Sequence, residues 1–207
     1  MNYLKNIGFY LLIIFLLAGA AEKAIAQPAK KKTAKGVQAH RGTILLDVHA
    51  KVNRQAHLRY AAFPKMDSLV AELPAGAEIV TADSVNFYYY KKGVYYVQQP
   101  KGIYVIAPLP GIRLHGLPIG YRRIAIGDKL YFYYFGTFYQ QVGNSEDYEV
   151  IIAPETAIVE AIPNGYKIKK VENIEYYFLG GVYYAEIDDP RMEDKVGYEV
   201  VTIIEAY

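Results

Sequence analysis

The side chains that do covalent chemistry in enzymes are scarce in this sequence. Its serines are Ser68, Ser84 and Ser145, and none stands in the Gly-x-Ser-x-Gly pattern that holds a hydrolase nucleophile on a sharp turn. Cysteine is absent, so the chain has neither a thiolate nucleophile nor disulfides. Glycine patterns that cradle phosphates are also missing. We therefore expect a protein that is not an enzyme.

The histidines do not form a metal-binding pattern, because no His-x-x-x-His or His-Glu-x-x-His pair occurs. His49 and His57 are eight residues apart, a spacing that aligns them on a helix, but Asp47 is the only acid near them. We expect no metal and no other cofactor. His115 is interpreted as a turn residue.

Acidic residues gather once, around Pro190 and Arg191. The carboxylates of this segment belong to Glu186, Asp188, Asp189, Glu193 and Asp194. Oxygen ligands of this kind suit calcium, but the spacing fits no calcium-binding loop, and a solvated surface loop is favoured. A carboxylate pair for glycoside cleavage depends on tertiary distance, so a wall or glycan hydrolase stays open as an alternative.

Tyrosine is the most conspicuous side chain, with 22 copies and no tryptophan. Because side chains alternate along a strand, Tyr89 faces one way while Tyr88 and Tyr90 face the other, so rings cover both faces. They either pack against neighbouring parts of the chain or present a surface to sugars or a protein. The predicted binding residues are Tyr88, Tyr90, Tyr96, Tyr131, Tyr133, Tyr139, Tyr176 and Tyr184.

These tyrosines belong to a segment that repeats three times. Its markers are Leu73-Pro74-Ala75-Gly76, Leu117-Pro118-Ile119-Gly120 and Ile162-Pro163-Asn164-Gly165, whose prolines are 44 and 45 residues apart. A β-rich run, an aromatic cluster, a glycine and a second aromatic pair follow each marker. Such a period is typical of repeat architectures.

Each repeat contains the pattern of a tight β-hairpin. Its two-residue turns are Lys92-Gly93, Phe135-Gly136 and Gly180-Gly181. Such a turn needs positive φ, which glycine adopts without a Cβ clash, so Gly93, Gly136 and Gly181 are predicted turn glycines. A last strand closes each repeat, so each repeat is predicted to contain four short strands.

The sequence thus predicts an all-β protein of three tandem hairpin-containing repeats of about 45 residues, as small barrels or as stacked sheets. The predicted divisions are 1–26, a signal peptide; 27–42, a basic flexible linker; 43–72, an N-terminal cap; and repeats at 73–116, 117–161 and 162–207. Residues 66–72 are expected to form one helical turn.

The run Tyr88–Tyr96, with Leu73–Gly76 before it and Gly102–Pro108 after it, resembles a family of exported bacterial proteins with a domain of unknown function. Repeats of that family read Leu-Pro-x-Gly, Tyr-Tyr-Tyr-x-x-Gly-Val-Tyr-Tyr and Gly-Tyr-x-Val-x-Ala-Pro. The resemblance covers residues 60–207; Thr137 departs from it, and the third repeat lacks the final Ala-Pro. It implies an exported location and this architecture, but no activity or catalytic residue.

The amino terminus has the three parts of a secretory signal. Lys5 precedes an apolar run from Ile7 to Ala21, which is shorter than a membrane-spanning helix requires. Ala24 and Ala26 supply the small side chains that signal peptidase needs, so cleavage is expected to leave Gln27 first. We expect no transmembrane span after cleavage.

Charge divides the remaining chain into a basic arm and an acidic body. Residues 27–65 carry a net charge of +8, and residues 66–207 carry −7. The arm either contacts anionic polymer, lipid or the body, or is a solvated linker; nucleic acid is not an expected partner of an exported protein.

We therefore expect an exported, non-catalytic envelope protein that is periplasmic, outer-membrane-associated or secreted. Its tyrosine-rich repeats are expected to serve as a scaffold or binding module for cell-wall polymer, surface polysaccharide or an envelope protein. A purely structural component of a surface assembly is a further alternative.

Overall fold

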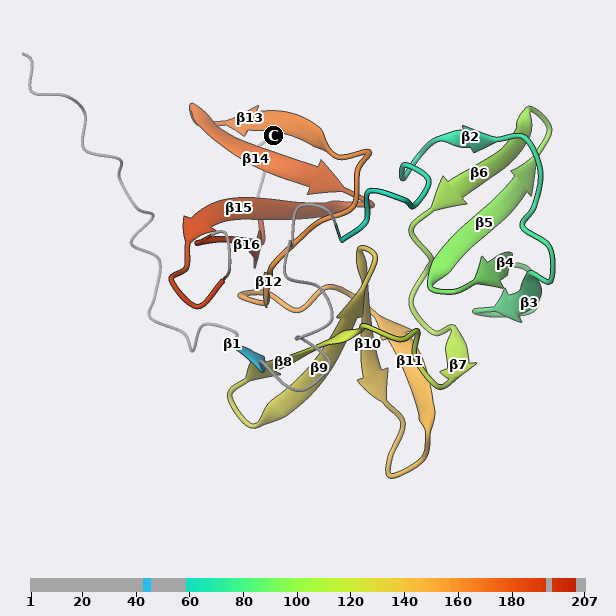
Figure 1. The fold of residues 1–207 in the computed structure, drawn as a ribbon, viewed down its shortest axis with the longest axis horizontal. Coiled ribbons are helices and arrows are strands. Elements are labelled where there is room, and N and C mark those ends of the chain that lie inside the picture. The colour runs from blue at the N-terminus through green and yellow to red at the C-terminus, as the bar shows by residue number, and fades with distance from the viewer. Residues whose placement is uncertain (1–42, 46–58, 193–194, 204–207) are drawn as a thin grey trace, which may run out of the picture. The chain divides into compact units, whose positions relative to one another are not determined.

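The computed structural model describes residues 43–45, 59–192 and 195–203, and it is all-β (Figure 1). Sixteen strands form three antiparallel sheets, and the described residues include no helix. The three sheets follow one another along the chain, and each is open rather than closed into a barrel. The predicted fold class of three hairpin-containing repeats is therefore confirmed.

All three sheets share one strand order, in which a short first strand lies beside the last strand and the others form a meander. The first sheet contains β2 (Leu69–Val70), β3 (Glu78–Thr81), β4 (Phe87–Lys91), β5 (Val94–Gln99) and β6 (Gly102–Ile106). The second contains β7 (Arg113–His115), β8 (Arg122–Ile126), β9 (Lys129–Tyr134), β10 (Thr137–Gln141) and β11 (Asp147–Ile151). The third contains β12 (Ile158–Val159), β13 (Lys167–Val171), β14 (Ile174–Leu179), β15 (Val182–Asp188) and β16 (Val196–Val201).

The second sheet has a sixth strand, β1 (Thr43–Leu45), which pairs antiparallel with β8. These three residues open the segment 43–72 that the sequence predicts to be an N-terminal cap. The predicted signal peptide, its cleavage residues Ala24, Ala26 and Gln27, and the basic linker lie outside the described residues.

Each repeat has a first strand that precedes its Leu-Pro-x-Gly marker: β2, β7 and β12 pair with β6, β11 and β16. A residue with positive φ comes just before it, namely Asp67, Gly111 or Thr156. Its N–H donates to a carbonyl of the last strand, as from Asp67 to Val105 at 2.9 Å. The helical turn expected over residues 66–72 is therefore wrong: a turn and β2 occupy that segment.

The two-residue hairpin turns are confirmed by their pairing and backbone angles. Lys91 pairs with Val94, Tyr134 with Thr137, and Leu179 with Val182. Both turn residues have positive φ in all three hairpins, and Gly93, Gly136 and Gly181 have φ of 87°, 79° and 88°. A turn of this kind matches the right-handed twist of the two strands that it joins.

Tyrosine rings are buried on both faces of these thin sheets, and their hydroxyl groups find partners inside. Tyr95 and Tyr139, from the first and second repeats, share a hydrogen bond of 3.1 Å. The hydroxyl of Tyr133 donates to the Ala161 carbonyl at 2.9 Å, and the Phe135 N–H donates to the Tyr60 hydroxyl at 3.1 Å. These bonds join parts of the chain that are far apart in sequence.

Consecutive repeats meet where a turn glycine lies against the next repeat. A Cβ at Gly93 would overlap the ring of Tyr134 and lie 2.9 Å from the Pro118 side chain. A Cβ at Gly136 would lie 3.3 Å from both Leu179 and Pro163. The marker proline of one repeat therefore covers the hairpin turn of the repeat before it. A Cβ at Gly181 would meet no atom of the described part of the chain within 4 Å.

Alanine substitutions at the three turn glycines separate backbone strain from close packing. Positive φ costs an alanine roughly 1–2 kcal/mol at each site, and overpacking adds roughly 1–3 kcal/mol where a neighbour must move. We expect Gly93→Ala to lower the urea midpoint of unfolding most, Gly136→Ala less, and Gly181→Ala least. Equal losses at all three sites would show that only the turn conformation matters.

Alkali is expected to unfold the protein as buried tyrosines are forced to ionise. Burial raises the pKa of Tyr95, and raises the pKa of Tyr133 and Tyr139 well above the ordinary value. Since an unfolded tyrosine titrates near pH 10, stability should hold below about pH 10 and fall above it, by about 1.4 kcal/mol per pH unit per buried tyrosine.

Phenolate absorbance and circular dichroism, followed together in an alkaline titration, check this expectation. The buried phenols should ionise only as the β-sheet signal is lost. Ionisation of all 22 tyrosines with the sheet intact would contradict it.

Candidate functional site

The tyrosines predicted to bind a ligand are mostly core residues. Tyr88, Tyr96, Tyr133, Tyr139 and Tyr184 are buried, while Tyr90, Tyr131 and Tyr176 are half-buried. A buried ring offers no face to a ligand, so the five buried tyrosines do not form the exposed aromatic surface that the sequence predicts. Packing, the other interpretation of the repeated rings, accounts for those five.

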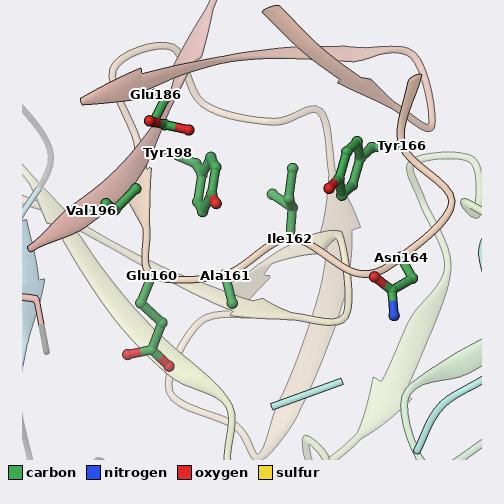
Figure 2. Close-up of a pocket in the computed structure, with 8 residues that line it drawn as sticks. All are labelled: Glu160, Ala161, Ile162, Asn164, Tyr166, Glu186, Val196 and Tyr198. Atoms are coloured by element: carbon green, nitrogen blue, oxygen red, sulfur yellow. The ribbon is translucent and has the colours of Figure 1, made fainter. Parts of the chain in front are cut away.

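A pocket does exist in the third repeat, between its marker segment and the sheet (Figure 2). Its volume is 380 Å³, within the range of small-ligand sites. The lining residues are Glu160, Ala161, Ile162, Asn164, Tyr166, Glu186, Val196 and Tyr198. Tyr166 and Tyr198 lie on either side of Ile162, with Asn164 near Tyr166 and Glu186 near Tyr198 (Figure 2).

Three tyrosine rings support this pocket in an edge-to-face row. The Tyr177 ring lies 5.0 Å from that of Tyr166 at 70° and 5.2 Å from that of Tyr198 at 81°. These are favourable geometries for aromatic pairs. The Tyr177 hydroxyl donates to Glu186 Oε2 at 2.7 Å, a bond that raises the pKa of Tyr177. The rings and the carboxylate are therefore held in fixed relation.

The other repeats lack this combination. Position 166 corresponds to Ala77 and Tyr121, position 177 to Tyr89 and Phe132, and position 186 to Gln98 and Gln141. The buried ring of Phe132 packs between Tyr121 and Tyr148, but it has no hydroxyl group to donate a hydrogen bond as Tyr177 does. Only the third repeat joins three tyrosines to a carboxylate, and this difference between aligned repeats is a sequence signal that could have indicated the site.

Glu160, at the opposite side of the pocket, belongs to a buried ion cluster. Arg59 Nη1 and Arg122 Nε both donate to Glu160 Oε1, the second at 2.5 Å. The side chains of Arg59, Arg122 and Glu160 are 3%, 4% and 12% exposed. Arg59 also donates to the Gly120 carbonyl, so this cluster ties the segment before the first repeat to the second and third repeats.

The two pocket carboxylates are poorly arranged for glycoside cleavage. Figure 2 shows the Glu160 carboxylate extending away from Glu186 and Tyr198. The Glu160 carboxylate is engaged in ion pairs with the buried guanidinium groups of Arg59 and Arg122. Glu186 is exposed and accepts a bond from Tyr177. The site is better suited to holding a ligand by rings and hydrogen bonds.

His115 and the acidic residue Asp189 form contacts within the second and third repeats, outside the pocket. His115 ends strand β7 instead of lying in a turn, and its Nδ1 lies 3.0 Å from Asp147 Oδ1 on the paired strand β11. Asp189, from the acidic segment, is buried and bonded to Arg191, while Glu193 and Asp194 lie outside the described residues. No cluster suited to a metal ion occurs in the described part of the chain.

No described helix has the length and apolar character needed to cross a membrane.

A sequence model described as a family of unknown function (DUF6515) matches residues 39–204. Neither the curated proteins nor the solved structures include a significant match.

Replacing Glu160 by glutamine tests the ion cluster. The variant removes the carboxylate that faces two buried guanidinium groups, and breaking such a buried pair costs roughly 3–5 kcal/mol. The matched control is Glu149→Gln, which breaks an exposed pair with Arg113 at 2.8 Å and should cost at most about 1 kcal/mol. Chemical denaturation measures both, and similar losses would show that Glu160 has no special structural role.

Proposed function

The chain belongs to the family of unknown function DUF6515, and we propose that it is an exported, non-catalytic envelope protein that binds a cell-wall or surface glycan in the pocket of its third repeat. The observation that supports this proposal is the row of tyrosines Tyr166, Tyr177 and Tyr198 beside the Glu186 carboxylate.

The chemistry of the pocket suits a sugar. The apolar face of a sugar ring packs against an aromatic ring, while sugar hydroxyl groups need hydrogen-bond acceptors and donors at the edge. Tyr166 is 40% exposed, and Glu186 and Asn164 are also exposed. A carboxylate offers about four lone-pair sites, so the bond from Tyr177 leaves acceptor capacity for a ligand.

Export is supported by the amino-terminal sequence: a lysine, an apolar run and the small residues Ala24 and Ala26 before Gln27. An exported protein meets cell-wall polymer and surface polysaccharide. The basic residues between Gln27 and Lys65 would add a salt-sensitive attraction to anionic polymer, separate from the pocket.

Binding to isolated cell-wall sacculi and to purified surface polysaccharide, over a salt series, tests the proposal. We expect Tyr166→Ala and Tyr198→Ala each to weaken binding roughly fivefold, since an aromatic contact contributes about 1 kcal/mol. Glu186→Gln should weaken it less, because an amide oxygen still accepts. The residual binding should survive high salt, since aromatic packing is not screened.

Tyr121→Ala is the matched control, because Tyr121 occupies the same position in the second repeat, outside the pocket. It should leave binding unchanged. Equal losses for Tyr121→Ala and Tyr166→Ala, or no binding to any glycan, would refute the proposal. Release of soluble sugar that depends on Glu186 would instead support the hydrolase alternative.

Truncations used in such tests must begin before Arg59. A chain that begins at Met66 lacks Arg59, Tyr60 and Phe63, of which Tyr60 packs against Phe135 with a centroid distance of 5.3 Å. Its loss of binding would report a damaged core and not the role of the basic arm.

A further inference from the structure

Two contacts join each repeat to its neighbours, and both involve the hairpin turn. In the first contact, the turn glycine lies against the marker proline of the next repeat and the residue before that repeat's own turn. Gly93 meets Pro118 and Tyr134 in this way, and Gly136 meets Pro163 and Leu179.

In the second contact, the other turn residue reaches back to an earlier linker. Phe135 packs on Phe63 with ring centroids 5.1 Å apart. Gly180, its counterpart in the third repeat, lies so close to Ala107 that an added Cβ would be 2.6 Å from the Ala107 side chain. Phe63 and Ala107 occupy equivalent positions in the linkers. Phe63 lies four residues before Asp67, and Ala107 lies four residues before Gly111, the positive-φ residues that open the first and second repeats.

Both contacts are incomplete at the ends of the array. No described residue lies within 4 Å of a Cβ added at Gly181, where the next marker proline would lie. Ile152, the linker residue equivalent to Phe63 and Ala107, is 79% exposed. The residues that would complete these contacts exist at the other end, in the first repeat: Pro74 and Lys91 for the first contact, and Lys92 for the second.

We infer that this protein associates head to tail with a second copy of itself, through the same contacts that join its repeats. The turn at Gly181 of one copy lies against Pro74 and Lys91 of the next. Lys92 of that next copy reaches back to Ile152 of the first. One association then covers both the open glycine and the exposed isoleucine.

The hydroxyl groups at the two ends match as well. Inside the chain, Tyr95 of the first repeat bonds Tyr139 of the second at 3.1 Å. The corresponding positions in the next two repeats hold Phe138 and Tyr184, and the buried Tyr184 hydroxyl has no hydrogen-bond partner among the described residues. The corresponding positions between copies hold Tyr183, whose hydroxyl accepts a bond from Lys169 Nζ at 3.1 Å within the chain, and Tyr96.

The association should be weaker than the internal contacts. Lys91 stands where the second and third repeats have Tyr134 and Leu179, and its amino group donates to the Gly76 carbonyl at 2.7 Å. The stem of a lysine can cover apolar surface, but a polar terminal repeat opposes stacking. Because the two surfaces differ, the contact is heterologous and can extend to chains of several copies.

The absence of cysteine in the sequence allows a direct test by disulfide cross-linking of the full chain. Equal amounts of a Pro74→Cys variant and a Gly181→Cys variant are mixed and oxidised. We expect a heterodimer to form at least roughly tenfold faster than dimers of either variant alone, because docking raises the local thiol concentration. A single chain carrying both changes should give a ladder of oligomers.

The matched control replaces Pro74→Cys by Ile119→Cys, at a marker residue that is 92% exposed and outside the inferred contact. A Pro163→Cys, Gly136→Cys chain should close an internal disulfide and shows that the geometry permits one. Cross-linking no faster than the Ile119→Cys control would overturn the inference, as would dimers formed only between two copies of the Gly181→Cys variant. Sedimentation of the unmodified chain should show concentration-dependent association, and a monomer at all concentrations would also overturn it.

Discussion

The absence of a side chain at the second residue of each hairpin turn is the constraint on which the rest of the structure depends. Each hairpin needs a residue with positive φ at the second turn position, and glycine supplies it. The same missing Cβ lets Pro118 and Tyr134 approach the first turn, and Pro163 and Leu179 the second. A local backbone requirement thus also determines how consecutive repeats pack, which explains why turn and marker recur together at one spacing.

Packing in this way explains the large number of tyrosines. A thin sheet buried on both faces needs large side chains, yet each face also meets backbone groups of a neighbouring repeat. A phenol fills volume and still supplies a donor and an acceptor, as in the bonds of Tyr133 to Ala161 and of Tyr60 to Phe135. With no disulfide in the chain, these buried rings and hydrogen bonds supply the cohesion.

Local patterns predicted the hairpins, the turn glycines and the last strand of each repeat, because those features depend on alternation and on turn chemistry. Strands of two or three residues, such as β2 and β12, have no detectable period and exist through pairing with a distant last strand. The sequence also did not reveal which tyrosine rings are buried. Tyr88 and Tyr176 occupy equivalent positions, but the first is buried and the second half-buried, because exposure depends on which repeat packs beside each ring.

The two proposed roles of the third repeat use opposite faces of one sheet. Side chains alternate along β14, so Tyr177 lies on the pocket side, while Tyr176 and Phe178 face the other way, as does Tyr183 opposite Phe178 on β15. Glycan binding at Tyr166 and Tyr198 therefore does not compete with the docking of a second copy near Gly181 and Tyr183. Because every copy carries one pocket, head-to-tail association would join several weak pockets in one assembly. A polymeric ligand that spans several of them binds far more tightly than one sugar unit in one pocket.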